Sequence, residues 1–344
     1  MYVIHVTLLP YIFGSNEIKS KPTQHSVKEL QSYGIIPDIL VCRTEQDIPD
    51  NIREKLALFC NVRKTSVIQN KTADCLYAVP LMLEEEGLAR EVCNHLKLDR
   101  YIPDNRKWEE MIEKIRKIDK NNKVKIAIVG KYIKLEDSYI SVIESIKHAG
   151  FANDVETEIK LIDAEKITKD TADEMLKEFQ GIVVPGGFGN RGIEGKIETL
   201  KYARDVLGLK DANSQEFDEK SKNQVIHIME NQKSVNKKGG TMRLGSYPCV
   251  IKEGTLAEKV YGTTEIAERH RHRFEYNNDY KERLENAGLI CSGTSPDGEL
   301  VEIVELSQKE HPFFIAGQFH PELKSRPNRP APLFVELVRV AKSR

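Results

Sequence analysis

Short apolar runs alternate with segments of helical period along the first hundred residues. Strands are predicted at VIHVTLL (3–9), PDILVCR (37–43) and TSVIQ (65–69), with helices at 23–34 and 51–59. Residues 77–96 are predicted to form one longer helix. Because alternating strands and helices build parallel sheets, this part is predicted to be α/β.

A second α/β unit is predicted after a charged linker helix at 105–120, so the domains are expected at 1–104 and 121–344. Its strands are predicted at 124–130, 155–163 and 181–185, and its helices at 138–150, capped by Gly150, and 171–179. Antiparallel strands are expected around the turn Pro296-Asp297-Gly298, before FFIAGQF and a helix at 331–343. The pattern predicts two doubly wound domains with mostly parallel sheets.

Composition narrows the function classes. A formal net charge of -1, from 52 basic and 53 acidic residues, predicts no bulk attraction to nucleic acid or anionic membranes. The six cysteines contain no C-x-x-C pair, which argues against a zinc site or a disulfide framework and favours a reducing cytoplasm. The apolar opening MYVIHVTLLPYIFG is too short for a membrane span and indicates a buried strand, so we expect further sequence upstream of it.

The segment GQFHPELKS carries the first candidate chemistry. His320 and Glu322 are two apart on an extended segment, which places them on one side, as a catalytic base and its orienting carboxylate would be. The alternative is a core histidine satisfied by a local carboxylate. A triad also needs a nucleophile on a G-x-S/C-x-G elbow, and no cysteine of this sequence has a glycine two residues before and two after it.

Three further motifs have open interpretations. In VPGGFGNRG, Gly187, Gly189 and Gly192 satisfy a dinucleotide fingerprint, but the late position favours an anion or oxyanion pocket, and a tight turn also needs glycines. In ERHRHRFEYNN the arginines share one face of a strand and the histidines the other. The arginines could clamp a carboxylate or line a solvated edge. No acidic or cysteine partner follows at metal-ligand spacing, so a metal site is not predicted.

The third motif, KSKPTQHS, places two lysines and a Thr-Gln pair before a helix, where phosphate or the polar edge of a base could bind. The alternative is a basic loop with Thr23 as the helix cap. The sequence contains no G-x-x-x-x-G-K-[ST] phosphate loop.

Read in order, the segments KSKPTQHSVKEL, IPDILVCR, ALFCNV, VGKY, VPGGFGNRGIEGK, ANSQEF, GGTMRLG, ERHRHRFEYNN and GQFHPE resemble the CTP synthase family over nearly the whole chain. The resemblance implies a cytoplasmic, tetrameric enzyme that phosphorylates O4 of UTP with ATP and Mg²⁺. Ammonia then displaces the phosphate. A class I glutamine amidotransferase domain, here 121–344, releases that ammonia, and GTP acts as the allosteric activator. Residues 1–104 resemble the end of the amidoligase domain. Neither a nucleic acid nor a membrane is implied as a partner.

The resemblance also implies roles for individual residues. His320 and Glu322 resemble the base and carboxylate of the glutaminase triad, and Gly187 resembles part of the oxyanion hole. Glu216 and Arg273 resemble the residues that hold the amino and carboxylate groups of glutamine. The implied site for UTP and the inhibitory product CTP comprises Lys19, Ser20, Lys21, Pro22, Thr23, Gln24 and Lys55.

The chain departs from the family pattern where Asp205 runs directly into Val206. The family has a strand, a cysteine elbow and a helix there, which by average lengths amounts to roughly two dozen residues. The nucleophilic cysteine and the front of the amidoligase domain, with its phosphate loop and magnesium-binding acids, are also expected to be missing. We therefore expect a truncated, internally deleted CTP synthase with little activity alone. The alternatives are a non-catalytic remnant that binds UTP or CTP and joins the intact enzyme, and a dinucleotide-binding protein.

Overall fold

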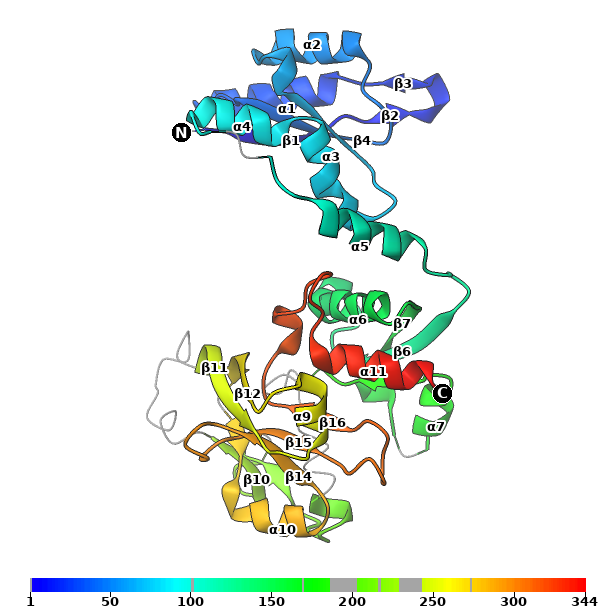
Figure 1. The fold of residues 1–344 in the computed structure, drawn as a ribbon, viewed down its shortest axis with the longest axis vertical. Coiled ribbons are helices and arrows are strands. Elements are labelled where there is room, and N and C mark those ends of the chain that lie inside the picture. Colours follow the sequence, from blue (N-terminus) through cyan, green and yellow to red (C-terminus); the bar gives the residue numbers. More distant parts are fainter. Residues whose placement is uncertain are drawn as a thin grey trace. The chain divides into compact units, whose positions relative to one another are not determined.

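The computed structural model describes residues 2–99, 102–168, 170–185, 203–215, 218–228, 243–272 and 274–344. The chain divides into two compact units, Met1–Arg116 and Lys117–Arg344, and the division falls within the predicted linker (Figure 1). None of the helices in the described ranges has both the length and the apolar character needed to cross a membrane. Each unit is described separately below.

The first unit is built on a three-stranded parallel sheet. The strands, in spatial order, are β1 (Ile4–Leu8), β4 (Ile39–Thr44) and β5 (Val67–Lys71). A hairpin of β2 (Tyr11–Ile12) and β3 (Glu17–Ile18) follows β1 and leads to helix α1 (Lys21–Ser32). On one face of the sheet, alternate residues of β4 pack against α1 and α2 (Asp50–Cys60). On the other face, the remaining residues pack against two further helices. Burial of both faces explains why the first four residues of β4, Ile39–Cys42, are all apolar.

The predicted helix at 77–96 is wrong in one respect, because the structure breaks it. A short 3₁₀ turn, η3 (Leu76–Ala78), leads into α3 (Val79–Glu85), and α4 (Leu88–Leu96) follows after a turn. Gly87 lies at this turn with a φ of 86°, a left-handed conformation that glycine adopts without steric cost. Helix α5 (Arg106–Arg116) also belongs to this unit, where the Trp108 indole donates to the Tyr77 carbonyl at 2.7 Å.

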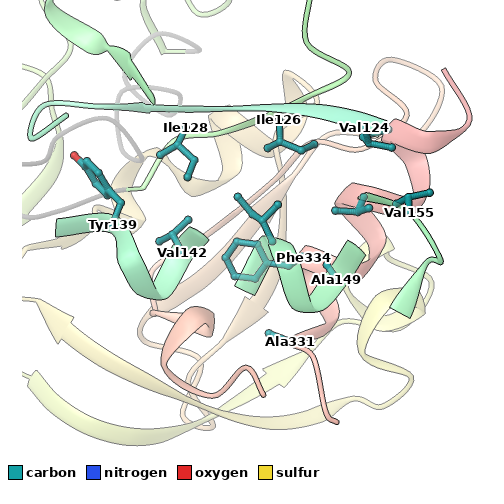
Figure 2. Packing of buried hydrophobic residues seen from close by; sticks show 12 residues of the cluster. Val124, Ile126, Ile128, Tyr139, Val142, Ala149, Val155, Ala331 and Phe334 are labelled. Atoms are coloured by element: carbon teal, nitrogen blue, oxygen red, sulfur yellow. The ribbon is translucent and has the colours of Figure 1, made fainter. Parts of the chain in front are cut away.

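The second unit begins with another parallel sheet. Its strands, in the order β7-β6-β8, are β7 (Glu156–Asp163), β6 (Lys123–Gly130) and β8 (Gly181–Val183). Helices α6 (Ile140–Ala152) and α11 (Pro332–Lys342) cover one face, where Phe334, Ile126 and Val142 belong to one apolar cluster (Figure 2). The short helix α7 (Ala172–Leu176) covers the other face.

Gly150 does not cap α6, contrary to the prediction. The helix continues to Ala152, and a Cβ at Gly150 would lie 2.9 Å from the Val155 carbonyl oxygen. Gly150 is therefore needed for the close approach of the following chain, and the left-handed turn residue is Asp154, with a φ of 54°.

The rest of the second unit is mainly antiparallel, as the turn at Pro296-Asp297-Gly298 predicted. The five-stranded sheet comprises, in spatial order, β12 (Glu265–His272), β11 (Arg243–Ile251), β14 (Ile290–Thr294), β15 (Val301–Glu305) and β16 (Ile315–Gly317). A smaller sheet contains β13 (Phe274–Tyr276), β10 (Gln224–Ile228) and β9 (Asn213–Ser214). Helices α9 (Leu256–Tyr261) and α10 (Lys281–Asn286) also belong to the described part of this unit. The predicted α/β class with parallel sheets is confirmed.

Candidate active site

His320 and Glu322 lie directly after β16, where the chain leaves the antiparallel sheet. Glu322 belongs to a 3₁₀ turn, η8 (Pro321–Leu323), and its Oε1 is 2.8 Å from His320 Nδ1. The side chains are 23% and 15% exposed, so solvent reaches the histidine. A carboxylate that accepts the Nδ1 proton leaves the lone pair of neutral histidine on Nε2. This arrangement suits a general base better than a sealed core histidine.

Strand β12 holds the segment that carries this dyad. The His320 amide donates to the Arg269 carbonyl at 2.8 Å, and the Lys324 ammonium donates to the Ala267 carbonyl. The buried Phe319 ring meets the His270 ring edge-on, with centroids 5.9 Å apart. The position of the dyad is therefore set by contacts to a strand about fifty residues earlier in the sequence.

A buried carboxylate, Glu268, lies next to the dyad. Its Oε1 accepts from the Tyr261 hydroxyl at 3.2 Å, and the Lys324 ammonium is 3.9 Å from Oε2. Burial raises the pKa of Glu268, and the nearby Glu322 carboxylate adds to the rise while Lys324 opposes it. Sequence reasoning missed Glu268 and Tyr261 as neighbours of the dyad, because only the folding of β12 and α9 brings them there.

None of the described cysteines of the second unit suits the role of nucleophile. Cys249 and Cys291 are buried, and burial raises the pKa of their thiols to about 12 and about 11. A catalytic cysteine needs the opposite shift, since the thiolate is the reactive form.

The three predicted glutamine-binding residues, Gly187, Glu216 and Arg273, all lie outside the described residues. Within the described part of β12, Arg269 and Arg271 are exposed and His270 and His272 are buried, which agrees with the predicted two faces of the strand. Burial, with Arg243 and His320 adding to the effect, lowers the pKa of His270 to about 3.

The structure describes β8, which precedes the predicted deletion, and residues 203–206, where the deletion is expected. Among the described residues, β8 is the last strand of its sheet, and no described strand stands between β8 and β9 along the chain. Ile182 of β8 is 42% exposed, which is unusual for the centre of a parallel-sheet strand. Residues 203–205 are helical and turn at Val206, which is itself exposed.

The predicted nucleotide-binding residues gather at the start of α1. Ser20, Thr23 and Gln24 are buried: Thr23 Oγ1 donates to the Leu8 carbonyl at 2.9 Å, and Gln24 Nε2 donates to Ser20 Oγ at 3.1 Å. Thr23 is therefore not the helix cap of the alternative interpretation. Residue Ser20 holds the N-cap position, and its side chain makes no capping hydrogen bond.

The lysines of this group lie at the surface. Lys21 and Lys55 are exposed, as is Pro22, and Lys19 is partly exposed and pairs with Glu17. The hydrogen bond from Lys19 lowers the pKa of Glu17, and Lys55 of α2 makes a weaker contribution, so both lysines lie near one carboxylate. Cations beside a helix N-terminus favour anionic ligands.

Comparisons with known proteins agree with this architecture. The family model described as CTP synthase N-terminus matches residues 1–98, and that described as glutamine amidotransferase class-I matches residues 134–340. The chain is 51% identical to a CTP synthase of Clostridium kluyveri and 49% identical to one of Geobacillus kaustophilus. Each alignment runs over 360 residues and covers 98% of this chain, but only 66% and 67% of the relatives.

A solved structure is similar to part of this chain. It is the glutaminase domain of Trypanosoma brucei CTPS with bound acivicin, which is 35% identical with a TM-score of 0.57, and the match covers 64% of this chain and 94% of that domain. The present chain spans about two thirds of the length of its curated relatives. The two family-model matches, the identity to the curated relatives and the fold together show that the chain belongs to the CTP synthase family.

Proposed function

We propose that this chain is a form of CTP synthase that retains the histidine–glutamate half of the glutaminase machinery and has little or no activity alone. The observation that carries the proposal is the His320–Glu322 pair, oriented as base and carboxylate in a sequence without a cysteine elbow. The family reaction is the ATP-dependent amination of UTP to CTP with ammonia from glutamine. ATP, Mg²⁺ and the activator GTP enter the proposal through the family, and no residue of this chain is assigned to them.

In the proposed reaction His320 would take the proton of a cysteine thiol, and Glu322 would hold the imidazole in the required tautomer. Backbone N–H groups near Gly187 would stabilise the oxyanion. Glu216 and Arg273 would pair with the amino and carboxylate groups of glutamine, as their charges suit. Without the thiol the other members contribute little, because a triad acts as a unit.

The length of the alignment supports an internal deletion. It runs over 360 positions, whereas 98% of 344 residues is about 337, so 360 minus 337 leaves about 23 positions of the relative without a counterpart. This is close to the length of one strand and one helix with an elbow. The exposure of Ile182 in β8, which has no further strand beside it among the described residues, is a further observation in favour, because a neighbouring strand would cover it.

Ammonia release from glutamine by the purified chain tests this proposal. We expect none above the buffer blank. A matched pair of insertion variants carries the elbow segment of the Clostridium kluyveri relative between Asp205 and Val206, with its cysteine either intact or replaced by alanine, and only the intact version should release ammonia. Release by the unmodified chain that disappears in His320→Ala would sink the proposal.

A second candidate function is a non-catalytic partner that binds UTP or CTP and associates with intact CTP synthase, whose family members we expect to form tetramers. The favouring observation is the group of Lys19, Lys21 and Lys55 around the start of α1, above the buried Thr23 and Gln24. Calorimetry with CTP and UTP tests it. Lys21→Ala should weaken binding, whereas the exposed Lys28→Ala on the same helix should not. Equal affinities in both variants, or no heat with either nucleotide, would remove this candidate.

The six free cysteines are the observation behind a proposed cytoplasmic location, since reducing compartments keep thiols unpaired.

A further inference from the structure

Four polar side chains from three strands meet in the interior behind the dyad. His270 and His272 come from the inner face of β12, Glu302 from β15 and Arg243 from the start of β11. The side chains of His270 and Glu302 are 0% exposed, and that of Arg243 is 8% exposed. His272 is also buried. Such a group is costly to bury unless every polar atom is satisfied.

The hydrogen bonds within this group are incomplete. His272 Nδ1 is 3.1 Å from the Phe274 carbonyl oxygen, which can only accept, so Nδ1 carries the proton and Nε2 the lone pair. That lone pair faces His270 Nδ1 at 3.0 Å. On the far side of its ring, His270 Nε2 finds no hydrogen-bond partner among the residues that the structure describes.

Neither neutral tautomer of His270 gives both of its ring nitrogens a suitable hydrogen-bond partner. With the proton on Nδ1, the lone pair of the buried Nε2 is unused. With the proton on Nε2, that donor is unsatisfied and two lone pairs face each other at 3.0 Å. Glu302 Oε2 is likewise without a hydrogen-bond partner in the described part of the chain, and it points into the group, 3.6 Å from His270 Nδ1.

We propose that His270, His272 and Glu302 bind a divalent transition-metal ion of the Zn²⁺ type, through His270 Nδ1, His272 Nε2 and Glu302 Oε2. Tetrahedral Zn²⁺ with bonds of about 2.0–2.1 Å places its ligand atoms about 3.3 Å apart. The two separations of 3.0 and 3.6 Å lie on either side of this value, and one ligand atom from each residue lies within 4.8 Å of the others. The bond from His272 Nδ1 to a carbonyl is the outer support that metal-bound histidines usually have.

Arg243 is the competing cation. Its NH1 lies 2.5 Å from Glu302 Oε1 and 3.5 Å from each of the two histidine nitrogens. Its guanidinium carbon is also 4.4 Å from the centre of the Tyr247 ring, an aromatic face that can hold it when it leaves Glu302. Binding is therefore an exchange, in which the metal ion replaces the guanidinium beside the carboxylate. The remaining positive charge limits the affinity of the native chain.

The site would lie directly behind the dyad. The His270 ring packs on Phe319, and the carbonyl of Arg269 accepts from the His320 amide. A bound ion would join β12 to β15 and so restrain the strand on which His320 rests. This inference does not depend on glutamine hydrolysis and can be tested in the chain as it is.

Titration of the full-length chain with Co²⁺, followed by visible absorption, tests the site. We expect a d–d band that saturates at one equivalent, lacks a thiolate charge-transfer band and is displaced by Zn²⁺. His270→Ala and the near-isosteric Glu302→Gln should each weaken binding about tenfold or more, as loss of a ligand does. Arg243→Met should strengthen it about tenfold or more, because the competing charge is removed.

His148→Ala is the matched control. His148 is a buried histidine of the same unit whose Nδ1 is 3.0 Å from Ser325 Oγ, so its loss disturbs a core without touching the group. Its affinity should equal that of the native chain. If His270→Ala does not fold by circular dichroism, Glu302→Gln decides. The site is overturned if the native chain shows no band, if either ligand variant binds Co²⁺ as tightly as the native chain, or if Arg243→Met binds no more tightly than the native chain.

Discussion

Two histidine–glutamate pairs lie at strand β12, and their surroundings differ. His320 and Glu322 are adjacent in sequence, 2.8 Å apart and partly exposed. His270 and Glu302 come from different strands, are 3.6 Å apart and are sealed from solvent beside Arg243. Solvent reaches the first pair, as the proposed general base requires, whereas the second pair is enclosed with a guanidinium. Access to solvent and the neighbouring groups, more than residue type, decide what a histidine–glutamate pair can do.

The largest difference is expected in catalysis, in the chain that carries the inserted cysteine elbow. There His320→Ala should lower glutamine hydrolysis by roughly 10⁴-fold or more, because the base acts as a unit with the thiol. Steady-state ammonia release measures it. His270→Ala in the same background should lose far less, since His270 does not touch the reacting atoms. Equal losses in the two variants would erase the distinction between the pairs.

The next effect concerns stability. Arg243→Met should lower the free energy of unfolding of the metal-free chain by about 3–5 kcal/mol, because it leaves the Glu302 carboxylate buried and unpaired. Arg339→Met, which breaks a pair at the surface of α11, should cost less than about 1 kcal/mol. Urea unfolding with a chelator present compares the two. Similar costs would contradict the burial argument.

The pH dependence of stability sharpens the comparison further. The folded pKa of His270 is lowered to about 3 from an ordinary value of 6.5, so between these two pH values the unfolded chain binds the proton and the folded chain does not. The contribution of neutral, buried His270 to the free energy of unfolding is complete above pH 6.5. It is lost as the pH falls toward 3, by up to about 1.4 kcal/mol per pH unit. Unfolding curves of the metal-free His270→Leu variant should show a shallower slope over this window. Identical slopes would rule the assignment out.

The smallest effect is expected at the dyad itself. Glu322→Gln should change the free energy of unfolding by no more than about 1 kcal/mol, because the carboxylate is partly exposed and the amide oxygen still accepts from Nδ1. Thermal unfolding measures it. A cost as large as that of Arg243→Met would place Glu322 among the structural groups of the core.

Much of the fold follows from local pattern. The strand alternation, the antiparallel turn at Pro296-Asp297-Gly298 and the two faces of β12 agree with prediction, because side-chain period is a local property. The break at Gly87 and the continuation of α6 past Gly150 were not predicted. A glycine within a helical pattern can end a helix or permit a close contact, and only the neighbouring chain decides which.

The candidate site divides in the same way. The sequence by itself determined the family, the two-unit α/β plan and the His320–Glu322 pair, since motif order and an i, i+2 spacing are written along the chain. Only the tertiary structure decided that Ser20, Thr23 and Gln24 are buried at the start of α1. It also decided that Glu302 and Arg243 meet the histidines of β12. These contacts join strands far apart in sequence, and no local spacing records which strands a sheet will bring together.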